Sequence, residues 1–188
     1  MIKHGGKMTF QEAWEKQPMS KPRIEKVTVN MGVGESGDRL LTGAKVMEEI
    51  TGQKPVRTLA KQTNPAFGIR KKLPIGLKVT LRGKKAEEFL KNAFIAFKAS
   101  GKTLYSYSFD KRGNFSFGIP EHIDFPGQKY EPDVGIYGMD VCVTFEKPGY
   151  RVKRRKIKRN SIPEKHLVKK EEAIEYIKTN FGVEVEEE

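Results

Sequence analysis

The feature that most constrains the fold is an alternating segment that leads directly into an amphipathic one. Residues 75–82 alternate between apolar side chains and Gly, Lys, Thr or Arg, which predicts a half-buried strand with one polar face. After Gly83, residues 84–98 place apolar side chains at the i, i+3, i+4 and i+7 positions of one helix face. A strand that leads into such a helix is typical of a domain in which helices cover one side of a sheet.

The other periodic segments predict the same kind of fold. Alternation predicts strands at 23–31, 54–58, 104–109 and 139–145, and helical spacing predicts helices around 10–14, from Asp38 to near Gly52, and at 169–181. Within 104–109, Tyr105, Tyr107 and Phe109 are expected to share one face. We therefore expect an α+β fold: a mostly antiparallel sheet with amphipathic helices on one face and a polar, basic, RNA-binding face on the other.

Two segments have no clear periodic pattern, and one abrupt change in composition indicates a domain boundary. Residues 110–138 are punctuated by glycine but contain short apolar pieces that can be ordered, and the tail 183–188 is expected to be frayed. After Pro148 the composition changes abruptly to a basic run. We expect one α+β core domain at 1–148, and a basic arm with a C-terminal helix packed as an extension at 149–188.

Positive charge is concentrated in two blocks. The chain carries a formal net charge of +12, yet residues 53–82 contain no Asp or Glu, and residues 151–159 are again free of carboxylates. A field this positive concentrates polyanions, of which nucleic acid is the commonest, whereas a soluble basic enzyme is the alternative. Two separate blocks suggest two contacts.

Several classes of site are disfavoured by composition. Cys142 is the only cysteine, which excludes an internal disulfide and a Cys-based zinc site, and the three histidines have no metal-ligand spacing. No metal or other cofactor is therefore expected. The N-terminal residues lack the apolar core of a signal peptide, and no segment has the length to span a bilayer. We expect a cytoplasmic protein without a membrane partner.

Residues 32–37 match the G-x-G-x-x-G pattern of dinucleotide-binding folds, between a predicted strand and a predicted helix. Glu35 would stand where an anionic pyrophosphate must approach, and the next strand offers no carboxylate for the ribose. The alternative is that the glycines form a tight turn or let another backbone come close. We favour this alternative, and Gly32 and Gly34 are kept as candidate rRNA-binding residues.

An enzyme is the other alternative, because five carboxylates cluster in sequence around His122. They are Glu121, Asp124, Glu131, Asp133 and Asp140. Nothing in their spacing defines an acid/base pair or a nucleophile with its base, so solvated loop charges and helix caps are the simpler interpretation. We expect no enzymatic activity and no catalytic residue.

The predicted polar sheet face carries donors of the kind that contact phosphate and sugar oxygens. Such a face can also be merely solvated, but the two polar strand faces, made of Lys26, Thr28 and Asn30 and of Lys78, Thr80 and Arg82, lack Glu and Asp, which favours RNA. The candidate rRNA-binding residues of the sheet and its neighbouring segments are Lys26, Thr28, Asn30, Gly32, Gly34, Gln53, Lys54, Arg57, Lys78, Thr80 and Arg82.

A long loop and a basic run are the remaining candidates. The loop 59–73 has no apolar period, and its Phe67 either stacks on a base or packs down as an anchor. The run 151–159 binds nucleic acid, acts as a localisation signal or stays unstructured; since a helix follows, we expect an extended arm lying on RNA. The loop candidates are Lys61, Gln62, Thr63, Asn64, Phe67 and Arg70, and the arm candidates are Arg154, Arg155 and Arg159.

Four segments resemble one family. PRIEKVTVNMGVGE, TGQKPVRT, FGIRKKLPIGLKVTLRG and FDKRGNFSFGIPEHIDFP are similar to the large-subunit ribosomal protein number five family, over about residues 21–147. The phrase IYGMDVCVTFEKPGY and the extension ending in a Lys/Glu-rich helix resemble the archaeal and eukaryotic branch, and the lack of other extensions favours archaeal.

The resemblance implies a structural protein of the large subunit that binds 5S rRNA in the central protuberance and helps attach it. Asn30, Gln53 and Thr80 match the family's 5S rRNA contact positions, with Arg82 beside the last. It also implies that the loop 61–72 contacts P-site tRNA: Arg70 matches a family position, whereas residues 62–66 depart from the bacterial pattern. Large-subunit rRNA and neighbouring ribosomal proteins of the central protuberance are the further implied partners. The arm has no bacterial counterpart, so its partner is inferred from charge alone.

Overall fold

A five-stranded antiparallel sheet forms the centre of the molecule. The computed structural model describes residues 10–132 and 134–186; expectations about residues 1–9, Asp133 and residues 187–188 lie outside it. The sheet has the order β2-β3-β1-β6-β5, and every neighbouring pair is antiparallel. Its strands are β1 (Arg23–Gly32), β2 (Val56–Leu59), β3 (Pro74–Leu81), β5 (Phe115–Ile119) and β6 (Met139–Glu146). The predicted α+β class with a mostly antiparallel sheet is confirmed.

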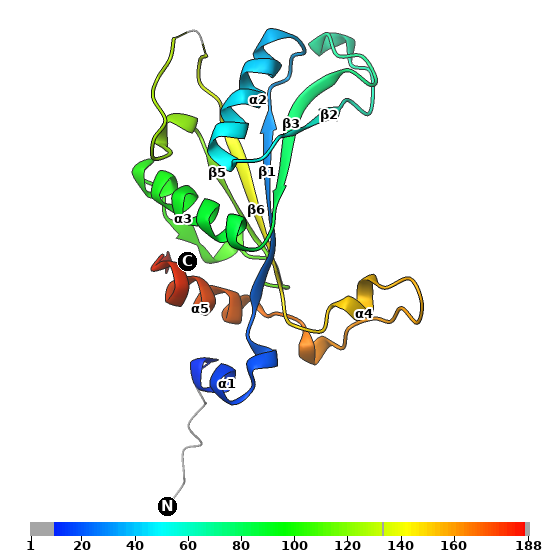
Figure 1. Ribbon diagram of the computed structural model, residues 1–188, viewed down its shortest axis with the longest axis vertical. Helices are drawn as coiled ribbons and strands as arrows, with labels where there is room; N and C mark the ends of the chain where they lie inside the picture. Colours follow the sequence, from blue (N-terminus) through cyan, green and yellow to red (C-terminus); the bar gives the residue numbers. More distant parts are fainter. Residues whose placement is uncertain (1–9, 133, 187–188) are drawn as a thin grey trace, which may run out of the picture.

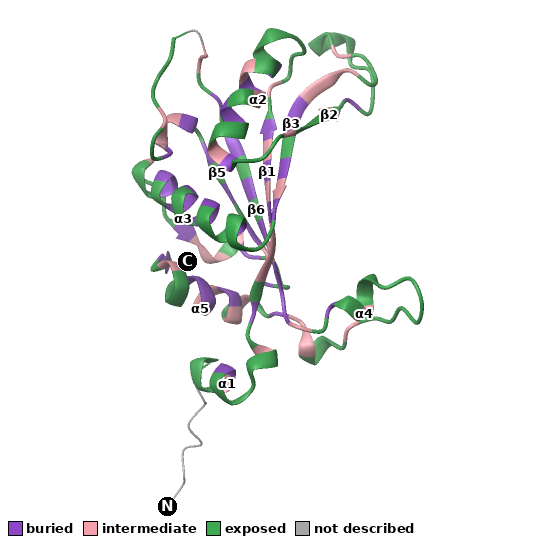
Figure 2. Cartoon of the chain, in the orientation of Figure 1, coloured by how far each residue is buried: buried purple, intermediate pink, exposed green. Residues whose placement is uncertain are grey.

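Helices α2 (Asp38–Thr51) and α3 (Lys84–Ala99) cover one face of this sheet (Figure 1). Phe94 of α3 stacks on Phe117 of β5, with ring centroids 5.4 Å apart. Gly43 of α2 lies so close to the sheet that an added Cβ would stand 3.4 Å from the Met31 sulfur. Figure 2 shows buried residues along the central strands and at intervals in both helices. The alternating apolar residues of the strands are thus buried under both helices, as their period predicts.

The C-terminal extension shares this core. Helix α5 (Lys170–Phe181) buries Ala173 and Ile177 in the same apolar cluster as the strands, and Tyr176 packs edge-on against Phe145 at 5.3 Å. Helix α1 (Phe10–Lys16) packs on α5 through Trp14, which is buried against Tyr176. As expected, Gly182 ends α5 in a left-handed conformation, φ 62°.

The predicted strand at 104–109 is wrong beyond its first two residues. Strand β4 contains only Leu104–Tyr105, and a 3-10 turn at Ser106–Ser108 follows. The turn breaks the alternation, so Tyr107 is 66% exposed while Phe109 is buried against Phe115. The prediction of a frayed tail is also wrong for the described residues 183–186. Strand β7 (Val185–Glu186) pairs with β4 in parallel, and Val183 and Val185 are buried.

Strand β5 lies inside the glycine-punctuated stretch, where no strand was predicted. It is five residues long, and Phe115, Phe117 and Ile119 point into the core. Gly37 occupies the N-cap position of α2. The other short helical elements are 3-10 turns at Pro18–Ser20, Pro65–Phe67, His122–Asp124 and Glu164–His166, and the helix α4 (Arg151–Arg154).

Candidate nucleic-acid interface

The face of the sheet opposite α2 and α3 carries a continuous polar surface. Antiparallel pairing of β1 with β3 sets Thr28 opposite Thr80 and Asn30 opposite Lys78. Residues directly opposite each other project from the same face, so these four side chains form one surface, the β1–β3 patch. All four are exposed or half-exposed. The two polar strand faces that the sequence predicts separately are therefore adjacent.

This surface continues across β6 and β5 with a different charge. Asn30 stands opposite Asp140 and Thr28 opposite Cys142, both exposed. Although Cys142 is exposed, partial desolvation raises the pKa of its thiol and the neighbouring Asp140 raises it further, while Lys78 opposes them, so the thiol stays neutral at physiological pH. The positive part of the face is thus confined to β1 and β3, and Asp140 limits it on the β6 side.

Strand β2 adds residues that the sequence did not single out. Val56 lies opposite Lys78 and Thr58 opposite Gly76, which places both on the polar face; Val56 is 68% exposed. Arg57 lies opposite Leu77, so its side chain projects from the face that the helices cover. It is exposed because β2 is the edge strand of the sheet. Gln53 and Lys54 are exposed in the turn between α2 and β2. The alternation of β2 therefore separates Arg57 from the β1–β3 patch.

The glycines after β1 form a tight turn. The N–H groups of Val33 and Gly34 both donate to the Ile75 carbonyl, at 3.1 and 2.9 Å, and Gly34 has φ 81°. Where Gly32 faces Gly76, a Cβ on Gly76 would stand 2.9 Å from the Met31 carbonyl oxygen. Moreover, β3 lies between β1 and β2, so the strands flanking α2 are not the adjacent parallel pair of a dinucleotide fold. The structural explanation of the glycines fits this geometry.

The loop between β2 and β3 is ordered. Its base is closed by hydrogen bonds from the Ala60 N–H to the Leu73 carbonyl, 2.8 Å, and from the Lys72 N–H to the Ala60 carbonyl, 2.9 Å. Around the 3-10 turn, the backbones of Asn64 and Ile69 exchange two further bonds. The lack of an apolar period in the sequence thus reflects a hairpin-like loop with few buried residues.

The loop candidates are displayed outward. Phe67 is 76% exposed, which excludes packing against the described residues as an anchor. Lys61, Gln62, Thr63, Asn64 and Arg70 are exposed as well, although Thr63 Oγ1 accepts a bond from the Lys71 N–H at 3.1 Å. An exposed aromatic ring among cations is the combination used for stacking on single-stranded bases.

The basic arm is folded back, so the expected extended conformation is wrong. After α4 the chain reverses: the Asn160 N–H bonds to the Val152 carbonyl at 3.3 Å, and Arg155 Nε bonds to the Lys158 carbonyl at 2.7 Å. Lys158 adopts φ 53° at this turn. These bonds, together with the ion pairs of Arg154, hold the segment as a compact hairpin.

Two candidate arginines have carboxylate partners within the chain. Arg154 pairs with Glu25, Nη1 to Oε1 at 3.1 Å, and its Nη2 pairs with Glu146, which is buried. Arg82 Nη1 lies 3.1 Å from the same Glu25 oxygen. Arg155 and Arg159 are exposed. The sequence could not indicate the Arg154 pairs, because these carboxylates lie on β1 and β6.

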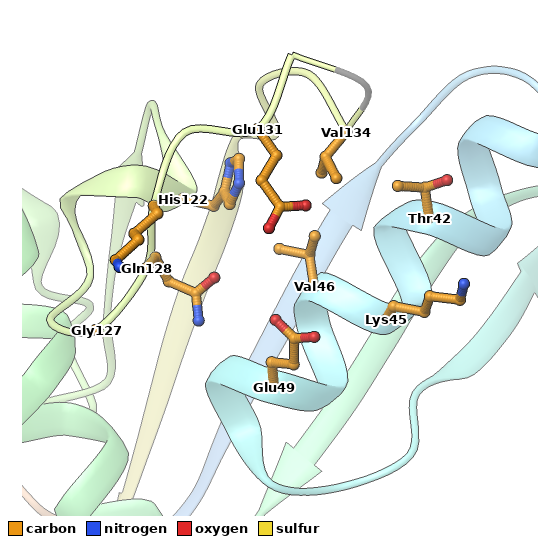
Figure 3. A pocket seen from close by; sticks show the side chains of 10 residues that line it. Thr42, Lys45, Val46, Glu49, His122, Gly127, Gln128, Glu131 and Val134 are labelled. Atoms are coloured by element: carbon orange, nitrogen blue, oxygen red, sulfur yellow. The ribbon is translucent and has the colours of Figure 1, made fainter.

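The described carboxylates that lie near His122 in sequence are spread over different parts of the fold. Figure 3 shows His122 and Glu131 facing Glu49 of α2 across a cavity of about 440 Å³. His122 Nδ1 accepts the Tyr137 N–H at 3.3 Å; burial lowers the pKa of His122, and Glu121 opposes that shift. Asp140 lies on the polar face of the sheet.

Asp124 lies beside the C-terminal end of α3. Its carboxylate accepts a hydrogen bond from the Ser100 hydroxyl at 2.6 Å. Within residues 10–132 and 134–186, no cluster of three or more His, Cys, Asp or Glu side chains is arranged to hold a metal ion. None of the described helices is both long and apolar enough to cross a bilayer.

Comparisons with known proteins agree on one family. The model of "Ribosomal protein L5" matches residues 17–70, and the model of the C-terminal part of the same ribosomal family matches residues 74–176. The large ribosomal subunit protein uL5 of the archaeon Methanococcus aeolicus is 83% identical over 181 residues, which cover 96% of this chain and 100% of that protein. The proteins of the same name from Methanococcus vannielii and Methanococcus maripaludis are 81% and 80% identical over 178 residues, 95% of this chain and 98% of each.

Proposed function

Because the chain belongs to the ribosomal protein L5 family, and is thus a structural constituent of the large ribosomal subunit, we propose that it binds 5S rRNA through the polar face of its sheet. The bound 5S rRNA is attached to the large subunit in the central protuberance. The loop 61–72 contacts P-site tRNA. Neighbouring ribosomal proteins of the central protuberance are further partners.

The β1–β3 patch is the observation that carries the rRNA assignment. Thr28, Asn30, Lys78 and Thr80 present hydroxyl, amide and ammonium donors on two paired strands without an intervening carboxylate. Such donors bind phosphate and sugar oxygens and position a nucleic acid without reading its sequence. A twisted sheet face fits the wide, shallow minor groove of an RNA helix, where the 2′-hydroxyls are displayed.

The tRNA assignment rests on the loop. Phe67 and the cations Lys61 and Arg70 are exposed on a segment whose backbone is closed by its own hydrogen bonds. The loop projects from the end of the sheet opposite the arm (Figure 1). A separate projection of this kind reaches a second RNA while the sheet holds the first.

The proposed function requires no catalysed reaction. Lys and Arg neutralise phosphates and release condensed counterions, and the shape of the face selects the helix. No second function is supported by a specific observation.

Filter binding to 5S rRNA at increasing salt tests the proposal. We expect tight binding with a steep decline in log affinity against log salt, because each neutralised phosphate contributes a slope of about −0.9. Incubation with NAD(P) is the parallel measurement. A flat salt dependence, or tight NAD(P) binding with indifferent RNA binding, would contradict the proposal.

A further inference from the structure

A second basic site lies where the arm folds back against the core. Its cavity, about 510 Å³, is lined by Arg112, Lys153, Arg159, Asn160, Ser161 and two apolar side chains. We propose that this arm pocket binds backbone phosphates of large-subunit rRNA while the sheet holds 5S rRNA. The inference rests on the proposed function and deepens it, since it assigns a separate site to the second RNA.

Arg112 is brought to the arm by a turn that only glycine permits. In the turn 110–114, the Gly113 N–H bonds to the Asp110 carbonyl at 2.9 Å, and Gly113 has φ 72°. Gly113 is buried against the segment that leads into α5: an added Cβ would stand 2.8 Å from Val168 Cγ1 and 3.1 Å from the Lys169 carbonyl oxygen. This close approach holds Arg112 beside the returning arm, although the two are far apart in the sequence.

The arm side of the pocket is held to the core by ion pairs. Arg154 ties α4 to β1 and β6 through Glu25 and Glu146, and Lys147 Nζ lies 2.6 Å from the Glu172 carboxylate. These pairs engage Glu25, Glu146 and Glu172. By contrast, Arg112, Lys153 and Arg159 form no ion pair within residues 10–132 and 134–186. The cations that hold the arm and the cations that line the pocket are therefore different residues.

The lining has the chemistry of a phosphate site. Three cations converge, and the Asn160 amide and Ser161 hydroxyl add neutral hydrogen-bonding groups; no carboxylate lines the pocket. Guanidinium groups present a planar fork of donors that matches two phosphate oxygens. Ile162 and Leu167 supply apolar surface beside them, and low-dielectric walls focus the positive field.

The extent of the positive surface favours RNA over a short acidic peptide. Residues 151–163 contain no carboxylate, and the stretch from Lys153 to Ser161 is exposed throughout. A chain of phosphates follows such a surface from the pocket along the arm, with one negative charge at each nucleotide. The arm lies beyond the start of β1 and the end of β6, at the opposite end of the sheet from the loop 61–72 (Figure 1). RNA on the arm therefore leaves that loop free.

The test uses the full chain in complex with 5S rRNA and labelled large-subunit rRNA of Methanococcus aeolicus as the probe. The variant Arg112→Ala/Arg159→Ala removes two pocket cations, and Lys85→Ala/Lys91→Ala removes two exposed cations of α3 as the matched control. We expect the pocket variant to bind the probe about tenfold more weakly or worse, with a salt slope reduced by about 2. Its affinity for 5S rRNA stays unchanged, as does probe binding by the control.

The outcomes separate this inference from the proposed function. Unchanged probe affinity in the pocket variant and in Arg112→Glu, with tight 5S rRNA binding, overturns the arm pocket alone. Equal losses of probe affinity in the pocket variant and in the control variant also overturn it, because they indicate a nonspecific effect of net charge. Failure of the wild-type chain to bind 5S rRNA overturns the proposed function. Displacement of the probe by polyglutamate as readily as by RNA of equal charge identifies an acidic protein segment as the occupant and overturns the RNA assignment.

Discussion

Glu25 and Arg154 join the sheet to the arm: Oε1 of the first lies 3.1 Å from Nη1 of the second. The same Glu25 oxygen lies 3.1 Å from Nη1 of Arg82 at the end of β3. Glu25 is located at the irregularity in β1, where the register to β6 shifts between Ile24 and Lys26. One carboxylate thus fixes the arm and also partners a cation beside the proposed 5S rRNA surface.

Replacing that carboxylate is expected to loosen the arm. Glu25→Gln keeps the shape but loses the charge, and because both arginines are about half exposed, the cost is about 1 kcal/mol. Limited trypsin digestion is expected to cut the arm faster, with Glu48→Gln, an exposed carboxylate of α2, as the control. Equal cleavage rates in all three proteins would show that Arg154 does not hold the arm through Glu25.

Removing two polar groups from the β1–β3 patch is expected to weaken 5S rRNA binding. Asn30→Ala/Thr80→Ala deletes an amide and a hydroxyl, each contributing about 1 kcal/mol, so affinity falls roughly tenfold or more while the fold persists. Filter binding measures the change. Asn92→Ala/Thr103→Ala removes the same groups from exposed positions elsewhere. Unchanged affinity in the first variant refutes the assignment of this face.

Deleting residues 62–67 is expected to spare 5S rRNA binding and to weaken P-site tRNA binding on reconstituted large subunits. Phe67→Ala is expected to reproduce part of the loss, because stacking contributes about 1–3 kcal/mol per base. Ile157→Ala, an exposed apolar residue of the arm, is the control. If the deletion abolishes 5S rRNA binding instead, the separation of the two surfaces is wrong.

Gly113→Ala is expected to destabilise the protein and displace the Arg112 turn. The new methyl group meets Val168 and the Lys169 carbonyl, and the backbone is left-handed, so the combined cost is about 2–4 kcal/mol. Gly127→Ala is the matched control, since Gly127 also has positive φ, 90°, but open space around it. Urea unfolding measures both. Equal destabilisation would mean that the close approach to α5 contributes nothing.

The buried histidine is expected to make stability depend on pH. Burial lowers the pKa of His122 below 6.5, so below pH 6.5 the unfolded chain binds a proton that the folded chain does not. Stability therefore falls as pH falls from 6.5 toward the folded pKa, and the His122 contribution levels off below it. Urea midpoints above and below 6.5 measure the slope, and His122→Gln is expected to reduce it. The same slope in the variant would assign the dependence to other groups.

The sequence predicts the elements well where their pattern is long. The alternation of 75–82 and the helical period of 84–98 correspond to β3 and α3 within a residue or two. Prediction fails where the signal is short or interrupted. Strand β5 has five residues among glycines, and the 3-10 turn at Ser106–Ser108 interrupts an alternation that reads as one strand. Likewise, the acidic tail gives no local indication that Val185 is buried beside Leu104.

By itself, the sequence determined the α+β class, the polar and apolar sides of β1 and β3, the excess of positive charge and the family resemblance. All of these depend on the order of residues along short segments. The tertiary structure alone decided that Asn30 stands opposite Lys78 and beside Asp140, that Glu25 holds Arg154, and that Arg112 lines the arm pocket. These contacts join residues far apart in the chain. Their geometry follows from strand order, register and the packing of α5 on Gly113, for which local periodicity carries no signal.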